Sequence, residues 1–178
     1  MQIAAVAAVI VFVFRDLAKP MQKREVPFIS VSRKIVGCVV QAMNIKDNDM
    51  VYELGCGDCR VLAAAYNQNP MAKYIGIEKN TIPFLLSKWR LRKILKPDSV
   101  DLLKKDMFDC NLSEATIVYA YLYPHIMDKL LPKLKQELKP GAKLVSCDFI
   151  FKEKEFNEII DLKRPGKSLG KKLYVYRF

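Results

Sequence analysis

The chain has 178 residues, of which 51% are hydrophobic and 28% are charged. This length and composition fit one globular domain with a hydrophobic core, and they exclude a disordered chain or a pair of full domains. A formal net charge of +11 indicates an anionic partner or surface, which can be phospholipid, nucleic acid or an acidic protein.

The first segment, from Ile3 to Phe14, is an unbroken apolar run that ends at Arg15. The run is shorter than the roughly 20 residues of a membrane-spanning helix. It also lacks the basic start and the cleavage site of a removable signal peptide. We expect residues 1–18 to form a membrane anchor; the alternative is a buried helix of the domain. Because lysines and arginines follow the run, the positive-inside rule would keep the domain on the cytoplasmic or matrix-like side.

Residues 19–31 are expected to form a linker, and residues 32–178 the folded domain. Apolar periodicity predicts helices over 32–43, 59–67, 83–95 and 124–138. Short apolar runs predict strands over 50–54, 74–77, 100–104, 115–121, 143–149, 156–162 and 173–178. Because the first five strands alternate with helices, they imply a parallel sheet, whereas the last two suggest an antiparallel hairpin around Pro165 and Gly166.

The chain has five cysteines, an odd number without the spacing of a disulfide framework, which favours a reducing compartment. Cys56 and Cys59 have the C-x-x-C spacing of redox and zinc sites. A zinc site would need further ligands, and the single histidine, His125, lies far away in the sequence. We therefore interpret both as small side chains in a tight loop, and we expect no metal site.

A glycine-containing loop joins the first predicted strand to the following helix. Gly55 and Gly57 allow a sharp turn and a close approach of a ligand to the backbone. A dinucleotide fingerprint would have a third glycine where Arg60 stands. Glu53 and Asp58 would repel a pyrophosphate. The loop therefore suits a ligand that has a cationic amino group and no phosphate.

Two more acids follow the next two strands. Glu78 can accept both hydroxyl groups of a ribose, and Asp106 can receive the amino group of an adenine. Either acid alone could simply cap a helix or face solvent. Together with the glycine loop, however, they mark the crevice at the carboxyl ends of adjacent parallel strands, where such sheets bind ligands.

These segments resemble the class I S-adenosylmethionine-dependent methyltransferases. Residues 53–58 are similar to motif I, residues 75–78 to motif II, and residues 105–108 to the adenine-binding segment. Further similar segments are 26–29, 120–124, 132–134, 138–141 and 145–149. They recur in the small membrane-tethered protein-lysine methyltransferases of the ATP synthase c subunit and the adenine nucleotide translocase, and in their bacterial relatives. The resemblance covers about residues 24–178.

The resemblance implies a Rossmann-like α/β fold, with a seven-stranded, mostly parallel sheet, helices on both faces and an antiparallel C-terminal hairpin. It also implies S-adenosyl-L-methionine as the cofactor, with Pro27 and Phe28 closing over it. The expected cofactor-binding residues are Pro27, Phe28, Glu53, Gly55, Cys56, Gly57, Asp58, Glu78, Asp106, Met107 and Tyr121. The sequence departs from the family at Cys59, where glycine is usual, and at Cys147, where histidine is common.

Three residues are candidates for catalysis. Tyr121 and Tyr123 could hold a substrate ammonium by cation–π contact and then orient the neutral amine. Asp148 is expected to pair with the incoming lysine. The predicted reaction is methylation of a lysine ε-amino group on a membrane-associated protein.

Two other functions stay open. Basic helices at 88–96 and 129–139 would suit an RNA methyltransferase, but Tyr-Leu-Tyr-Pro stands where an amino-group nucleic-acid enzyme has Asn-Pro-Pro-Tyr. Nucleic acid is therefore not the expected partner, because anionic lipid also accounts for the basic charge. The second alternative is a membrane-associated module that binds the cofactor without catalysis.

Overall fold

The structure is a computed structural model that describes residues 30–94, 100–164 and 169–178. The predicted anchor, most of the predicted linker and the predicted turn at Pro165 and Gly166 lie outside these ranges. Within them, no helix combines the length and apolar character that crossing a membrane requires.

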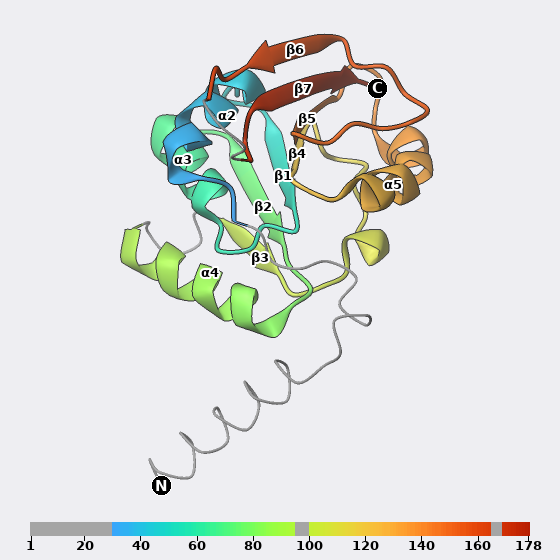
Figure 1. Ribbon diagram of the computed structural model, residues 1–178. Helices are drawn as coiled ribbons and strands as arrows, with labels where there is room; N and C mark the ends of the chain where they lie inside the picture. Colours follow the sequence, from blue (N-terminus) through green and yellow to red (C-terminus); the bar gives the residue numbers. More distant parts are fainter. Residues whose placement is uncertain (1–29, 95–99, 165–168) are drawn as a thin grey trace, which may run out of the picture.

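One seven-stranded sheet forms the centre of the domain, in the order β3-β2-β1-β4-β5-β7-β6 (Figure 1). The strands are β1 (Met50–Leu54), β2 (Lys73–Ile77), β3 (Asp101–Leu103), β4 (Ile117–Ala120), β5 (Lys143–Cys147), β6 (Glu158–Asp161) and β7 (Lys172–Arg177). The first five are parallel, and β7 runs antiparallel to both β5 and β6. The predicted Rossmann-like fold is therefore confirmed. Strands β4 and β5 end earlier than predicted, so Tyr121 and Phe149 lie in the loops that follow them.

Helices cover both faces of the sheet. Figure 1 shows α2 and α3 on one side and α5 on the other. The helical elements are η2 (Arg33–Ile35), α2 (Val36–Met43), α3 (Arg60–Gln68), α4 (Thr81–Ile94), η3 (Met107–Asp109) and α5 (Pro124–Glu137).

Successive strand residues point to opposite faces and so separate the core into two clusters. Val51 of β1 packs with α2 and α3, whereas its neighbour Tyr52 packs with α5. The burial of both faces explains why β1, β4 and β5 read as nearly continuous apolar runs.

The C-x-x-C cysteines pack inside the domain. Cys56 and Cys59 are free and buried. A methyl group at Gly76 of β2 would stand 3.0 Å from the Cys56 sulfur and 3.1 Å from the Cys59 sulfur. Gly76 thus leaves the space that the two thiols occupy, so the loop after β1 packs directly onto β2.

We expect Gly76→Ala to destabilise the domain by about 1–3 kcal/mol, because the added methyl group overpacks this contact. Urea denaturation of the full chain measures the change. Gly37→Ala is the control, since no atom lies within 4 Å of the added methyl group in α2 and alanine suits a helix better by about 0.5–1 kcal/mol. Equal stability of Gly76→Ala and the wild type would contradict the contact.

Candidate active site

A small cavity lies at the carboxyl ends of β1 and β4, beside the loop that leads into α3. Its lining residues are Ser30, Val31, Glu53, Gly55, Cys56, Gly57, Asp58, Arg60, Tyr119 and Tyr121. Six of the expected cofactor-binding residues thus lie around one space, although they come from two regions that are far apart in the sequence: β1 with the loop after it, and the loop after β4.

The loop between β1 and α3 turns through three residues with left-handed backbone. Gly55, Gly57 and Cys59 have φ angles of 69°, 57° and 54°. A methyl group at Gly55 would come within 3.2 Å of Leu122, so a side chain would crowd the turn. Cys59 adopts a conformation that favours glycine, and the burial of its thiol against Gly76 offsets that strain. This explains how cysteine stands where the family usually has glycine.

Asp58 is held between two arginines. Arg60 donates from Nε to Oδ1 at 2.8 Å and from Nη2 to Oδ2 at 2.6 Å. Arg90 of α4 donates to Oδ2 at 2.8 Å. Burial acts to raise the pKa of Asp58, but the two guanidinium groups outweigh it and hold the pKa below its usual value. Asp58 is therefore an ionised, already neutralised structural group of the loop.

Glu53 is the carboxylate that stays uncompensated. Its side chain is buried and accepts a hydrogen bond from the Leu62 N–H in the first turn of α3. Its second oxygen, Oε2, and the Tyr119 hydroxyl have no hydrogen-bond partner among the described residues. Burial, which disfavours the charged form, raises the pKa of Glu53 well above its usual value.

This pair of orphaned polar atoms fits the amino-acid end of S-adenosylmethionine. Buried polar groups normally have partners, so Glu53 Oε2 and the Tyr119 hydroxyl mark a place for a polar ligand. The ligand group that matches a carboxylate is a cation, such as an α-ammonium group. The residues present therefore fit the expected cofactor, with Glu53 rather than Asp58 facing its positive charge.

Glu78 ties the end of β2 to the same loop. Its Oε2 accepts the Gly57 N–H at 3.0 Å, and its Oε1 accepts the Asn80 N–H at 2.7 Å. Burial raises the pKa of Glu78, although hydrogen bonds from Gly57, Lys79 and both the backbone and the side chain of Asn80 act to lower it. The ribose contact of Glu78 stays a prediction.

Asp106 caps η3 and also pairs with a lysine. Its Oδ1 accepts the Phe108 N–H at 3.1 Å, while Oδ2 lies 2.9 Å from Lys79 Nζ. Burial acts to raise the pKa of Asp106, but the Lys79 and Phe108 contacts lower it overall. Next to it, the Met107 side chain reaches toward Gly55. The adenine contact of Asp106 and Met107 stays a prediction.

Aromatic rings form a row beside the cavity. Phe149 lies between two tyrosines. The centre of its ring is 5.8 Å from that of Tyr121, on which it stacks, and 5.6 Å from that of Tyr123. His125 stacks on Tyr123 at 6.1 Å. Because Tyr121 also lines the cavity, the row leads from the cofactor position toward the surface.

Asp148 already has partners. Its carboxylate accepts hydrogen bonds from the backbone N–H groups of Gly170, Lys171 and Lys172, which fix the start of β7. It also accepts the hydroxyl of Tyr121. The expected pairing with an incoming lysine stays a prediction, but these contacts make Asp148 foremost a positioning residue for Tyr121. Burial, followed by the charges of Cys147 and Asp148, raises the pKa of Tyr121, so its hydroxyl stays protonated.

Pro27 and Phe28 lie outside the described residues. The chain that follows them does reach the site, since Ser30 and Val31 line the cavity and the Val31 carbonyl accepts a hydrogen bond from Arg60 at 2.8 Å.

Arg90, Tyr119 and Phe149 were not predicted as site residues. Tyr119 could have been found from its place opposite Glu53 in the parallel register of β1 and β4. Phe149 belongs to a segment of the family resemblance, but its stacking partners are not visible in the sequence. Arg90 stands in a basic helix in which no signal separates it from its neighbours.

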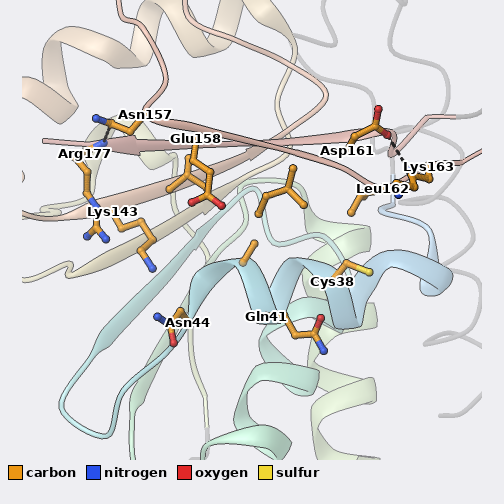
Figure 2. Close-up of a pocket in the computed structure, with 13 residues that line it drawn as sticks. Cys38, Gln41, Asn44, Lys143, Asn157, Glu158, Asp161, Leu162, Lys163 and Arg177 are labelled. Carbon is orange, nitrogen blue, oxygen red and sulfur yellow. Dashed lines mark hydrogen bonds between the residues drawn. The ribbon is translucent and has the colours of Figure 1, made fainter.

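A larger cavity, of about 720 Å³, lies away from these residues. It is a groove between α2 and the strands β6 and β7, lined by residues such as Gln41, Glu158 and Arg177 (Figure 2). Its lining lacks the glycine loop and the acids after β1 and β2. The chemistry therefore points to the smaller cavity.

Comparison with known proteins gives one family and several similar proteins. A family model described as the ANTKMT methyltransferase domain matches residues 53–158. The protein-lysine N-methyltransferase of Saccharolobus islandicus (strain REY15A) is 29% identical over 150 residues, which are 84% of this chain and 93% of that protein. The adenine nucleotide translocase lysine N-methyltransferase of Mus musculus is 31% identical over 127 residues, which are 70% of this chain. The matched region spans 54% of the mouse protein.

Among solved structures, an RNA methyltransferase from Salinibacter ruber in complex with S-adenosyl-L-homocysteine is similar over 84% of this chain and 93% of its own. The TM-score is 0.76 and the sequence identity is 27%.

We expect the affinity for S-adenosylmethionine to rise with pH. The free Glu53 has a raised pKa, and a bound ammonium favours its ionised form, so binding releases a proton. The rise should begin above the ordinary glutamate pKa and is best measured by calorimetry between about pH 5 and 7.5, where an α-amino group stays protonated.

Glu53→Gln is the matched variant, since it keeps Glu78 and the shape of the side chain. It should bind the cofactor roughly 10- to 100-fold more weakly, which corresponds to the loss of one charged hydrogen bond. Its affinity should rise less steeply with pH than that of the wild type, because only Glu78 of the two acids with raised pKa remains. The same pH slope in both proteins would exclude Glu53 as the group that meets the ammonium.

Proposed function

Because this chain belongs to the ANTKMT methyltransferase domain family, we propose that it transfers a methyl group from S-adenosylmethionine to a lysine ε-amino group of a membrane-associated protein. The observation that carries the proposal is the aromatic row of Tyr121, Phe149 and Tyr123 beside the cofactor cavity. The lysine methyltransferases of Saccharolobus islandicus and the mouse support the substrate class.

The chain is an S-adenosylmethionine-dependent methyltransferase, and its residues mainly have to hold the cofactor and align it with the substrate. When bound, S-adenosylmethionine supplies an electrophilic methyl group on a sulfonium. Glu53 and Tyr119 would hold its amino group, and Glu78 its ribose. Alignment of two reactants can contribute about 7–11 kcal/mol to a reaction rate, so a rigid glycine loop serves the chemistry directly.

The aromatic row would bind the substrate lysine. A lysine arrives as an ammonium, because its ordinary pKa is near 10.4, and ring faces attract such a cation. Removal from water lowers the lysine pKa, so the amine loses its proton more readily inside the site. Tyr121 then has a fixed hydroxyl, held by Asp148, that can orient the neutral nitrogen.

We further propose that residues 1–18 tether the enzyme to a membrane, with the domain on the cytoplasmic or matrix-like side. The apolar run from Ile3 to Phe14 and the lysines and arginines that follow it support the tether and its orientation. A tether would confine the enzyme to the surface where its substrate lies.

RNA is the second candidate substrate, favoured by the similarity to the Salinibacter ruber RNA methyltransferase and by the net charge of +11. The aromatic row does not distinguish a lysine substrate from RNA, because aromatic rings also stack on nucleobases. Identifying the methylated product does.

Labelling tests the proposed reaction. Membranes and cytosol are incubated with the full chain and S-adenosylmethionine that carries a labelled methyl group. We expect label on a membrane protein, and mass spectrometry should place the methyl group on a lysine. Label on RNA, on arginine or on a carboxylate would reject the lysine assignment and leave the methyltransferase activity standing.

In the same assay, Phe149→Leu should lower kcat/KM about 2- to 30-fold, the range that corresponds to the loss of one cation–π contact. Affinity for S-adenosylhomocysteine should stay unchanged, because Phe149 does not line the cofactor cavity. Phe156→Leu is the matched control, because it removes a ring that contacts Tyr174 and Tyr176 and does not belong to the row, and it should retain the activity. Equal activity of Phe149→Leu and the wild type would remove the row from substrate binding.

Fractionation tests the tether. We expect the full chain to stay in the membrane pellet after a high-salt wash and a carbonate wash, because apolar insertion resists both. Release by either wash would mean that the basic charge, and not residues 1–18, holds the protein at the membrane.

A further inference from the structure

Helix α4 carries an exposed apolar surface that methyl transfer does not use. Leu85, Leu86 and Trp89 have exposed fractions of 58%, 45% and 59%. Single exposed apolar residues are ordinary on protein surfaces, but a contiguous group of large ones marks an interaction site. These three residues lie within two turns of one helix.

Basic side chains surround this apolar group. Lys88, Arg92 and Lys93 are exposed on the same helix, and Thr81–Ile94 contains neither aspartate nor glutamate. Within the described part of the chain, none of these three cations has a carboxylate partner. Lys93 Nζ instead lies 4.0 Å from the centre of the Trp89 ring. The surface thus combines uncompensated positive charge with exposed apolar side chains.

The opposite side of α4 is fixed to the domain. Ser87 is fully buried on that side. Arg90 pairs with Asp58 at 2.8 Å. These contacts set the rotation of the helix, so the apolar and basic residues are presented outward. Figure 1 shows α4 at the end of the domain that is opposite β6 and β7.

We propose that this side of α4 lies on an anionic phospholipid surface. Leu85, Leu86 and Trp89 would enter the boundary between headgroups and acyl chains, where tryptophan is enriched. Lys88 and Arg92 would contact the lipid phosphates. The net charge of +11 attracts the whole domain to such a surface.

A lipid surface fits these residues better than RNA does. RNA phosphates would pair with Lys88 and Arg92, but they would leave Leu85 and Leu86 without a partner. The Lys93 ammonium already lies over the Trp89 ring, 4.0 Å from its centre, and would compete with a nucleobase that stacks on the same face. The surface shares no residue with the aromatic row or with the proposed tether, so the proposal stands whether or not the enzyme methylates lysine.

Tryptophan fluorescence tests the proposal directly, because Trp89 is the single tryptophan of the full chain. The full chain is mixed with vesicles of phosphatidylcholine alone or with phosphatidylglycerol added. Some of the lipids carry bromine in the acyl chains, which quenches a tryptophan that enters the bilayer. We expect a blue shift and strong quenching with the anionic vesicles, and much less of both with the neutral ones or at high salt.

The double variant Lys88→Gln/Arg92→Gln should lower the ratio of docked to undocked helix roughly 30-fold, because each base near an anionic surface contributes about a factor of five. Lys135→Gln/Lys139→Gln is the control. It removes the same charge from exposed positions at the end of α5 and should dock like the wild type. Insertion of residues 1–18 does not affect the comparison, since that segment contains no tryptophan.

Unchanged Trp89 emission with both kinds of vesicle would overturn the proposal. So would equal quenching in the α4 variant and the wild type. If an RNA oligonucleotide changes the emission whereas anionic vesicles do not, the surface belongs to nucleic acid instead.

Discussion

The ion pairs around Asp58 fix the part of the structure on which the rest of the site depends. Arg60 and Arg90 bind one carboxylate from two helices, and Arg60 also holds the Val31 carbonyl. Three segments of the chain are thereby joined at one turn. Removing one partner from such a partly buried network is destabilising, because it leaves a charge unpaired. Because Asp58 is fully paired, Glu53 is the acid of the cavity that is left to meet a cationic ligand.

The division of labour between these two acids shows the limit of the sequence prediction. The order of strands and helices and the glycine turn after β1 were predicted correctly, because they follow from local patterns. The ion pairs of Asp58 were not predicted, because its second partner, Arg90, lies 32 residues away. Burial and pairing depend on such distant contacts.

The same reasoning applies to the substrate side. Tyr121 and Tyr123 could be singled out because they follow a strand in a segment of the family resemblance. Phe149, which contacts both rings, comes from the loop after β5 and enters the site only because β4 and β5 are neighbours. Asp148 follows β5 in the same way, and its hydrogen bonds to the start of β7 come from the C-terminal hairpin. The fold itself is shared by many methyltransferases, so side chains at the strand ends, and not the sheet, decide the substrate.

Cys59 has a consequence for how the cofactor turn forms. Glycine at this position would relieve the left-handed strain in the folded protein, but it would also give the unfolded chain more conformations to lose. Cysteine reverses both effects, and its buried thiol secures the turn against Gly76. The turn therefore loses less conformational entropy on folding and is preorganised before a ligand arrives.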